Sequence, residues 1–460
     1  MGNTNKIDKK ILLQWVVTII CTAIILFTYK EDGLMNWAQT KFFAVTLFFI
    51  LLTAFELVPN MIIAMLLPFS YLLLGLAPAT TVFSSYSNNV VWMVICGLII
   101  TNVLMRIGIL NRIVYWCISK IGYSYRKIVF AFAVSAIVLH LVCPPGGYLV
   151  FAAVAYSFCK ILKLDGTKTG TGIMLAGALM IGMCFVYSPD SQGLMISVAN
   201  TIDPDLTLDY VSYFVHNLPM LIFYFIPYLL IPVLFKQDAS IDENLLKEEV
   251  KKLGKMSTNE KKGAILTIIF VIYLLTNSIH NLGMQYGFLL LVAFFYLPGI
   301  NIGIADDIKK ANYPLAFFIA SFISIGAVAS SLEFNAIVSE IMVPLLSFSD
   351  TDAVIYTLVY LFGFLTNFLM TPLGALGSLS APLTQIAMDM GLSEYAMLYA
   401  FNGGLYEVLL PYEIVKFLVF FAYGMFSFKD FAKLFGIRAI LHLFYLPLVM
   451  VPYWHLIGLI

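Results

Sequence analysis

Long apolar segments, repeated along most of the chain, are the feature that most limits what this sequence can fold into. A helix needs about 20 predominantly apolar residues to cross the hydrocarbon layer of a membrane. Of the 460 residues, 61% are hydrophobic and 11% are charged, whereas soluble domains average about 45–50% apolar and about 25% charged residues. We therefore expect an all-α polytopic membrane protein. The uninterrupted spans that we predict are residues 11–30, 41–57, 60–77, 89–105, 213–235, 264–280, 286–299, 313–331 and 437–458.

The sequence lacks the motifs of nucleotide-driven pumps and of common enzymes. It contains no P-loop, GxSxG, HExxH or EF-hand pattern, so we expect no enzymatic activity and no cofactor. The six cysteines lie in or beside apolar segments and form no CxxC pair, which indicates core residues and not a disulfide set or a metal site. The formal net charge is zero, which indicates no nucleic-acid partner. The first apolar run, from Ile11, has no small-residue cleavage site and is expected to be a retained span.

Four further apolar segments are interrupted by proline, glycine or polar clusters. They are 128–160, broken at CPPGG (143–147); 171–200, broken at YSPDSQG (187–193); 353–391, broken at TPLGALGS (371–378); and 396–426, broken at LLPYEIVK (409–416). The first and third are predicted to be re-entrant hairpins, because arms of roughly 15 residues are short for full spans. The second and fourth are predicted to be broken helices that cross the membrane with an unwound middle. This gives about eleven crossings and two hairpins.

The distribution of positive charge indicates the orientation. With the N-terminus on the inside, 23 of the 26 Lys and Arg residues fall on the inner side, and the exceptions are Lys30, Lys41 and Lys416. Loops rich in Lys and Arg face the cytoplasm. We therefore predict a multi-pass protein of the cell inner (cytoplasmic) membrane, surrounded by lipid, with a cytoplasmic N-terminus. The charged stretch 236–263 is predicted to be a solvated cytoplasmic linker or surface helix.

The order of segments repeats in the two halves of the chain. GLIITNVLMRIGILNRIV (97–114) aligns with SFISIGAVASSLEFNAIV (321–338), and each is followed by a hairpin and then by a broken crossing. In the predicted topology the first copy enters from the inside and the second from the outside. This order predicts an inverted repeat with the substrate site at the paired breaks. The predicted division is scaffold 1–127, transport bundle 128–235, linker 236–263, scaffold 264–352 and transport bundle 353–460.

Helix breaks inside a membrane expose backbone groups, which is tolerated where the break is buried or lines a wet cavity. The N-terminus of a half-helix offers N–H groups suited to anions, and a C-terminal end offers carbonyls suited to cations. Kinked packing helices are the alternative interpretation of the breaks. The candidate substrate-binding residues are Cys143, Pro144, Pro145, Gly146, Gly147, Ser188, Pro189, Asp190, Ser191, Asn367, Thr371, Pro372, Gly374, Gly377, Ser378, Pro411, Tyr412 and Glu413.

Ionisable side chains in membrane segments are costly, at least about 2.5–3.5 kcal/mol for Asp190, and indicate functional sites. We expect Asp190 or Glu413 to bind a proton or coupling ion, with Lys416 as a fixed positive charge that can take the electrostatic role of a sodium ion. A structural ion pair between Glu413 and Lys416, three residues apart, is the alternative. His140 is interpreted as a hydrogen-bonded packing histidine in preference to a proton relay. Glu56 is interpreted as a structural cap.

Three stretches resemble one known family. FELVPNMIIAMLLPFSYLLLGLAPA (55–79) resembles the early segment of the divalent anion/sodium symporters, the carriers of dicarboxylates, citrate and sulfate. NNVVWMVICGLIITNVLMRIGILNRI (88–113) resembles their fourth span and amphipathic helix, and LPYEIVKFLVFFAYGMFSFKDFAKLF (410–435) resembles their closing segment. The resemblance implies secondary transport, a homodimer formed through the scaffold and an elevator-like movement. The family's Ser-Asn-Thr hairpin tips are replaced here by CPPGG and MTPLGALGS, so its sodium coupling and dicarboxylate choice do not carry over.

These observations predict a secondary active transporter that moves a small organic anion, of di- or tricarboxylate type, by an elevator mechanism coupled to sodium or protons. Two alternatives stay open. The same fold could carry a cation or a neutral solute with proton coupling, because acids at the breaks repel anions unless they are protonated or paired. A channel is the other alternative, because paired breaks also build selectivity filters.

Overall fold

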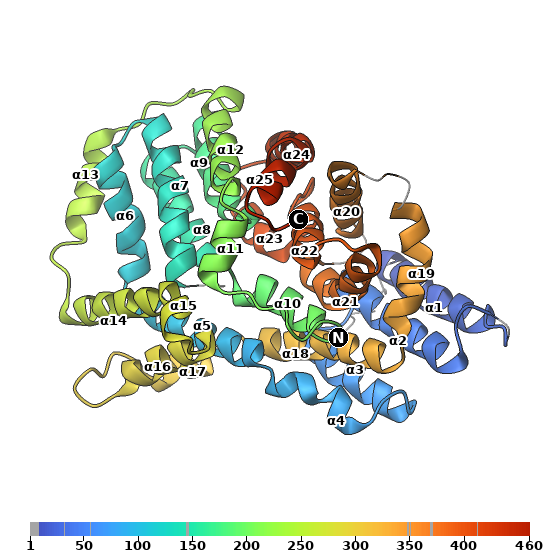
Figure 1. Cartoon of the computed structure of the whole chain (residues 1–460). Coiled ribbons are helices and arrows are strands. Elements are labelled where there is room, and N and C mark those ends of the chain that lie inside the picture. Colours follow the sequence, from blue (N-terminus) through green and yellow to red (C-terminus); the bar gives the residue numbers. More distant parts are fainter. Residues whose placement is uncertain are drawn as a thin grey trace, which may run out of the picture.

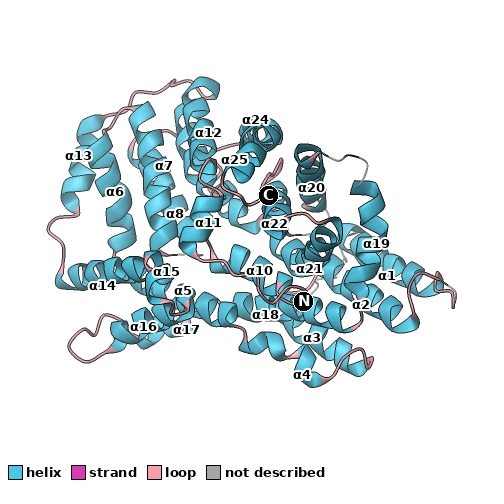
Figure 2. Ribbon diagram, in the orientation of Figure 1, coloured by secondary structure: helices cyan, strands magenta, loops and turns pink. Residues whose placement is uncertain are grey.

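Helices make up the fold, and no strand occurs in the described part of the chain (Figure 2). The computed structural model describes residues 9–31, 33–55, 57–143, 147–346, 349, 351–368, 371–411 and 413–460. The predicted all-α class is confirmed. Within these ranges the stretches that are by themselves long and apolar enough to span a membrane are α5 (Asn89–Arg106), α7 (Tyr125–Val142), α18 (Tyr313–Ser331) and the continuous stretch Phe428–Leu456. The other predicted spans are shorter or more polar helices, so the count of about eleven crossings stays a prediction.

The N-terminal helices pack beside α18. They are α1 (Lys9–Phe27), α2 (Trp37–Ala54) and α3 (Asn60–Leu73), followed by the short helices α4 (Ala79–Val82) and η1 (Ser84–Ser87) (Figure 1). A separate hydrophobic cluster joins α2 and α3 to Phe318 and Phe322 of α18. Helix α2 begins where the Asn36 side chain and Gln39 form reciprocal hydrogen bonds. The third predicted span ends early, at Leu73, because Gly75 adopts a left-handed φ of 64°.

The two halves present the same order of elements. Helix α5 leads into the amphipathic α6 (Ile109–Ile121) and then into α7 and α8 (Gly147–Ile161). Helix α18 leads into α19 (Phe334–Leu346) and then into α20 (Asp352–Thr366) and α21 (Pro372–Met390). The hairpin arms α8 and α20 have the expected 15 residues, but α7 has 18 and α21 has 19. Arm length therefore does not argue for re-entry, which stays a prediction.

Both predicted broken helices are interrupted, but each interruption begins earlier than expected. Helix α9 (Lys168–Ala178) and its 3₁₀ end η2 (Leu179–Gly182) stop before a non-helical segment. Pro189 then opens a π-helical turn, η3 (Pro189–Gly193), that continues into α10 (Leu194–Ala199). Pro189 begins the second half-helix and does not break the first, because its missing N–H costs nothing in a first turn. Helix α22 (Glu394–Leu405) is likewise separated from α23 (Val415–Phe421).

The predicted span 213–235 consists of two helices bent by 70°. Helix α11 (Tyr210–His216) ends at Asn217, whose Nδ2 donates to the Tyr213 carbonyl at 3.0 Å. Pro219 precedes α12 (Met220–Leu234) and has no N–H with which to continue the helical ladder. The linker contains the expected helix, and the elements after it are α13 (Glu243–Lys252), α14 (Thr258–Leu275), α15 (Asn277–His280), α16 (Met284–Tyr296) and α17 (Ala305–Lys309).

The last predicted span, 437–458, begins earlier than expected. Helix α24 (Phe428–Tyr445) starts after Ser427, which forms a capping box with Asp430, and passes through a π-helical turn, η4 (Leu446–Met450), into α25 (Val451–Leu456). Arg438, which the charge count placed on the inner side, lies inside this helix and is 3% exposed. Helices α22 to α25, coloured orange to red, lie beside the green α10 to α12 (Figure 1).

Candidate functional site

The two broken helices meet through a buried ion pair. The Nζ atom of Lys416, in the first turn of α23, lies 3.0 Å from Oδ2 of Asp190, in the π-helical turn η3. The Asp190 side chain is 1% exposed and the Lys416 side chain is 27% exposed. Ser188 donates its hydroxyl to the other carboxylate oxygen, Oδ1. Sequence reasoning selected Asp190 and Lys416 but did not pair them.

A second polar contact joins the same two breaks. The hydroxyl of Tyr406, the residue that ends α22, donates to Ser191 Oγ at 2.9 Å. The η3 turn is fixed internally as well, because the Ser188 N–H donates to Gln192 Oε1 at 2.9 Å. Ser188, Ser191 and Gln192 are buried. The first break is thus held rigidly against the second.

Glu413 does not pair with Lys416. Its carboxylate turns back on its own break and accepts hydrogen bonds from the backbone N–H groups of Leu409 and Leu410, the latter at 2.8 Å. Asn367, at the end of α20, adds a third donor at 3.2 Å. The alternative interpretation of a Glu413–Lys416 ion pair is therefore wrong. Glu413 satisfies the free N–H groups of the unwound segment and joins this break to the second hairpin.

A second buried charge cluster lies behind the breaks and was missed by the sequence analysis. Glu407, which is 0% exposed, accepts a hydrogen bond from His442 Nδ1 at 2.7 Å, and its Oε1 lies 3.2 Å from Arg438 Nη2. Arg438 also donates to the carbonyls of Gly182 and Tyr406. An arginine within the apolar run of α24 was the available signal, since ionisable residues in such runs face the protein interior.

The other described candidate residues have positions in the local structure of the hairpins and breaks. Cys143 is buried, and its thiol donates to the Leu139 carbonyl of its own helix. Thr371 caps α21 by accepting the Gly374 N–H at 3.3 Å, and Ser378 donates to the Gly374 carbonyl at 2.8 Å. The remaining candidates have the following positions: Gly147 and Pro372 each begin a helix, Gly377 lies against Phe322, and Pro411 is buried. Pro144, Pro145, Gly146, Tyr412 and Glu56 lie outside the described residues.

Two aromatic or imidazole side chains from the first hairpin approach the ion pair. Lys416 Nζ lies 5.8 Å from the centre of the Tyr148 ring, within cation–π range. His140 is close enough to Asp190 and Lys416 to feel the charge of both, and its buried Nε2 has no hydrogen-bond partner among the described residues. The first hairpin therefore contributes to the surroundings of the pair, although its tip lies outside the described residues.

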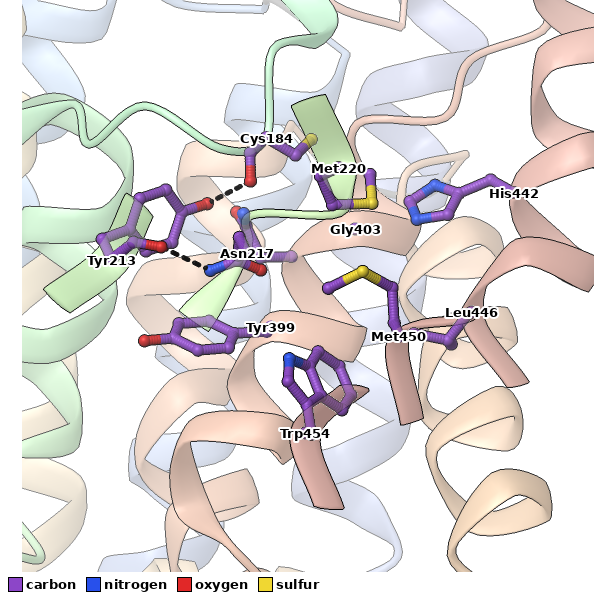
Figure 3. A pocket seen from close by; sticks show the side chains of 11 residues that line it. Cys184, Tyr213, Asn217, Met220, Tyr399, Gly403, His442, Leu446, Met450 and Trp454 are labelled. Carbon is purple, nitrogen blue, oxygen red and sulfur yellow. Dashed lines mark hydrogen bonds between the residues drawn. The ribbon is translucent and has the colours of Figure 1, made fainter. Parts of the chain in front are cut away.

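Two cavities border this region. One has a volume of about 690 Å³ and reaches from Tyr187 and Gly193, beside the η3 turn, to a rim of amide side chains. Those amides belong to Asn88, Asn89, Asn200, Asn277, Asn281 and Gln285. The other, shown in Figure 3, measures about 10 Å³ and lies between Tyr399, Met450 and Trp454. That volume admits about one water molecule, so of these two cavities the larger has room for an organic solute. A third cavity, of about 530 Å³ and apolar lining, lies against Phe185 and Val186 in the first interruption.

Comparison with known proteins supports the resemblance seen in the sequence. The family described as the sodium:sulfate symporter transmembrane region matches residues 9–460. Among curated proteins, none matches the chain. Among solved structures, the YdaH transporter of Alcanivorax borkumensis, described as having an unusual topology, is similar with a TM-score of 0.57 and 16% sequence identity, over 97% of this chain and 98% of that chain. The chain is thus a membrane transporter, not an enzyme, and it belongs to the sodium:sulfate symporter family.

Proposed function

We propose that this transporter carries a small organic anion, of di- or tricarboxylate type, through the site where its two broken helices meet. One observation carries the proposal: the more exposed side chain of the ion pair is that of Lys416, at 27%, whereas the Asp190 side chain is 1% exposed. Glu413 is also buried and bonded to backbone N–H groups. The acids at the breaks are therefore compensated, and the charge left for a solute to contact is positive, which favours an anion.

We further propose an elevator-type movement of the two hairpin and broken-helix bundles against a scaffold of α1 to α5 and α14 to α18. The repeated order of elements supports an inverted repeat, in which substrate binds at the paired breaks. The family resemblance supports a homodimer formed through the scaffold. The distribution of Lys and Arg supports the inner membrane and a cytoplasmic N-terminus.

Counterflow in proteoliposomes tests this function. Vesicles containing the purified protein are loaded with unlabelled succinate, citrate, sulfate or a neutral amino acid, and entry of the matching labelled solute is followed. The proposal predicts saturable exchange of succinate or citrate. Current that rises without saturation, and without exchange, would establish a channel instead and refute the proposal.

One observation favours a second candidate, the transport of a neutral polar or cationic solute. Among the described residues that line the 690 Å³ cavity, none is Lys or Arg, and the one charged side chain is that of Asp209. An entry path of this kind is neutral to acidic and does not attract anions. In the same panel, exchange of the amino acid with no exchange of succinate, citrate or sulfate would support this candidate over the first.

A further inference from the structure

Arg438 links the C-terminal ends of η2 and α22. Each of these ends closes the first half of a broken helix. Its Nη2 donates to the carbonyl of Gly182, the last residue of η2, at 2.8 Å, and its Nη1 donates to the carbonyl of Tyr406, which ends α22, at 3.1 Å. One guanidinium therefore bonds the carbonyl ends of both broken helices at once. The two carbonyls come from different halves of the chain, 224 positions apart in sequence.

These carbonyl ends are where a cation is favoured. The C-terminal end of a helix carries a partial negative charge and unpaired carbonyl oxygens. In carriers with broken helices, such ends and the unwound carbonyls beside them bind sodium ions or protons. The family name implies a sodium ion, but the residues present do not fit one here, because Arg438 already bonds both carbonyls and supplies a full positive charge.

The guanidinium is held in place on every side. A Cβ atom added to Gly182 would lie 2.7 Å from Cζ of Arg438, so only glycine leaves room for it. Glu407 Oε1 lies 3.2 Å from Nη2, and His442 Nδ1 in turn bonds that carboxylate oxygen. Arg438, Glu407 and His442 are each at most 3% exposed. A buried charge that contacts two carbonyls and a carboxylate is a fixed part of the site and not an exchangeable ion.

We propose that Arg438 is a resident cation that takes the place of a sodium ion at the joined half-helix ends, so that this carrier does not require sodium there. The inference rests on the proposed transport function for its mechanism, but its first test does not depend on transport. It also differs from the role of Lys416, whose ammonium group bonds the Asp190 carboxylate.

Thermal unfolding of the purified protein in detergent, with sodium, choline or guanidinium chloride, tests the inference directly. A cation that binds the folded state and not the unfolded state raises the melting temperature, and the rise grows with the logarithm of its concentration above its dissociation constant. The wild type is expected to melt at the same temperature in sodium and in choline. Arg438→Ala is expected to melt lower in choline and to regain part of the loss, with this concentration dependence, in sodium or guanidinium. A sodium-specific, concentration-dependent shift in the wild type would overturn the proposal.

Arg112 provides a matched control. It also pairs with a glutamate, Glu260 at 2.7 Å, and donates to two backbone carbonyls, those of Leu253 and Gly254, but it lies in the scaffold and linker. Arg112→Ala is expected to lower stability with no cation-specific recovery. Equal recovery in both arginine variants would contradict a specific role for Arg438.

Two more variants keep the test decisive if Arg438→Ala does not fold. Gly182→Ala keeps the arginine but displaces its guanidinium, and Arg438→Lys keeps the charge but loses the planar fork with which the guanidinium bonds both carbonyls. Each is expected to lose exchange of succinate or citrate in choline, with partial recovery in sodium. Full exchange by both variants without sodium would refute the proposal. Absence of exchange by the wild type with every solute would instead refute the transport function. The role of Arg438 as a resident cation would then be tested by the unfolding experiment alone.

Discussion

Removing Lys416 should destabilise the folded protein, because Asp190 would be left charged in a buried position. Breaking a buried ion pair by removing one partner costs about 3–5 kcal/mol. The Lys416 side chain is 27% exposed, so water can reach the vacated space, and we expect Lys416→Met to cost about 3 kcal/mol, the lower end of that range. Ser188 keeps its bond to the carboxylate and does not neutralise it.

The interaction is measured by a double-mutant cycle with Asp190→Asn. The double variant leaves no unpaired charge, so its cost should fall below the sum of the single costs by roughly 0.5–3 kcal/mol. Unfolding of the purified protein by added denaturing detergent, followed by tryptophan fluorescence, gives the four stabilities. Lys433→Met is the control, since Lys433 is exposed and bonds one carbonyl, that of Leu234. Additive single effects would refute the Asp190–Lys416 pair.

Three other predictions concern single contacts of the broken helices. Tyr406→Phe and Ser191→Ala each remove the same hydrogen bond and should each cost about 1 kcal/mol, with the double variant costing little more. Gly404→Ala should destabilise the protein strongly, because its Cβ would overlap a backbone oxygen of α20. Asp238 accepts the first N–H groups of α9, above all that of Lys168, and these bonds lower the pKa of its carboxyl. Its stabilisation is therefore present above the pKa of about 3.9 expected in the unfolded chain and is lost as pH falls through the lower folded pKa. The melting-temperature difference between wild type and Asp238→Ala should thus be constant near neutral pH and shrink in acid; a difference that grows in acid would contradict this role.

The sequence allowed the helical class, the family and the existence of both broken helices to be predicted. Proline and glycine within apolar runs signal an interruption, but they do not locate it, because Pro189 is tolerated at a helix start. The first half-helices instead end at Gly182 and at Leu405, which is followed by its cap residue Tyr406. Arg438 bonds the carbonyl oxygens of Gly182 and Tyr406, and local spacing in the sequence could not reveal this contact.

The partners of the charged residues could not be predicted. Spacing suggested a pair of Glu413 with Lys416, three residues apart, as the alternative interpretation, yet Lys416 contacts Asp190, 226 positions away in the sequence. Helical spacing failed because the segment before α23 is unwound and turns Glu413 back on Leu409 and Leu410. Arg438 was missed because it was counted with the Lys and Arg residues of the inner side, although it lies within the predicted span 437–458.

The most direct test of the central claim is anion binding by purified protein. Labelled succinate and citrate are offered in sodium-free buffer to the wild type, to Lys416→Gln and to the control Lys433→Gln. If the solute binds where the two broken helices meet, the wild type and Lys433→Gln bind at least one of these anions with the same affinity, and Lys416→Gln does not. Binding by Lys416→Gln at the wild-type affinity would contradict the account.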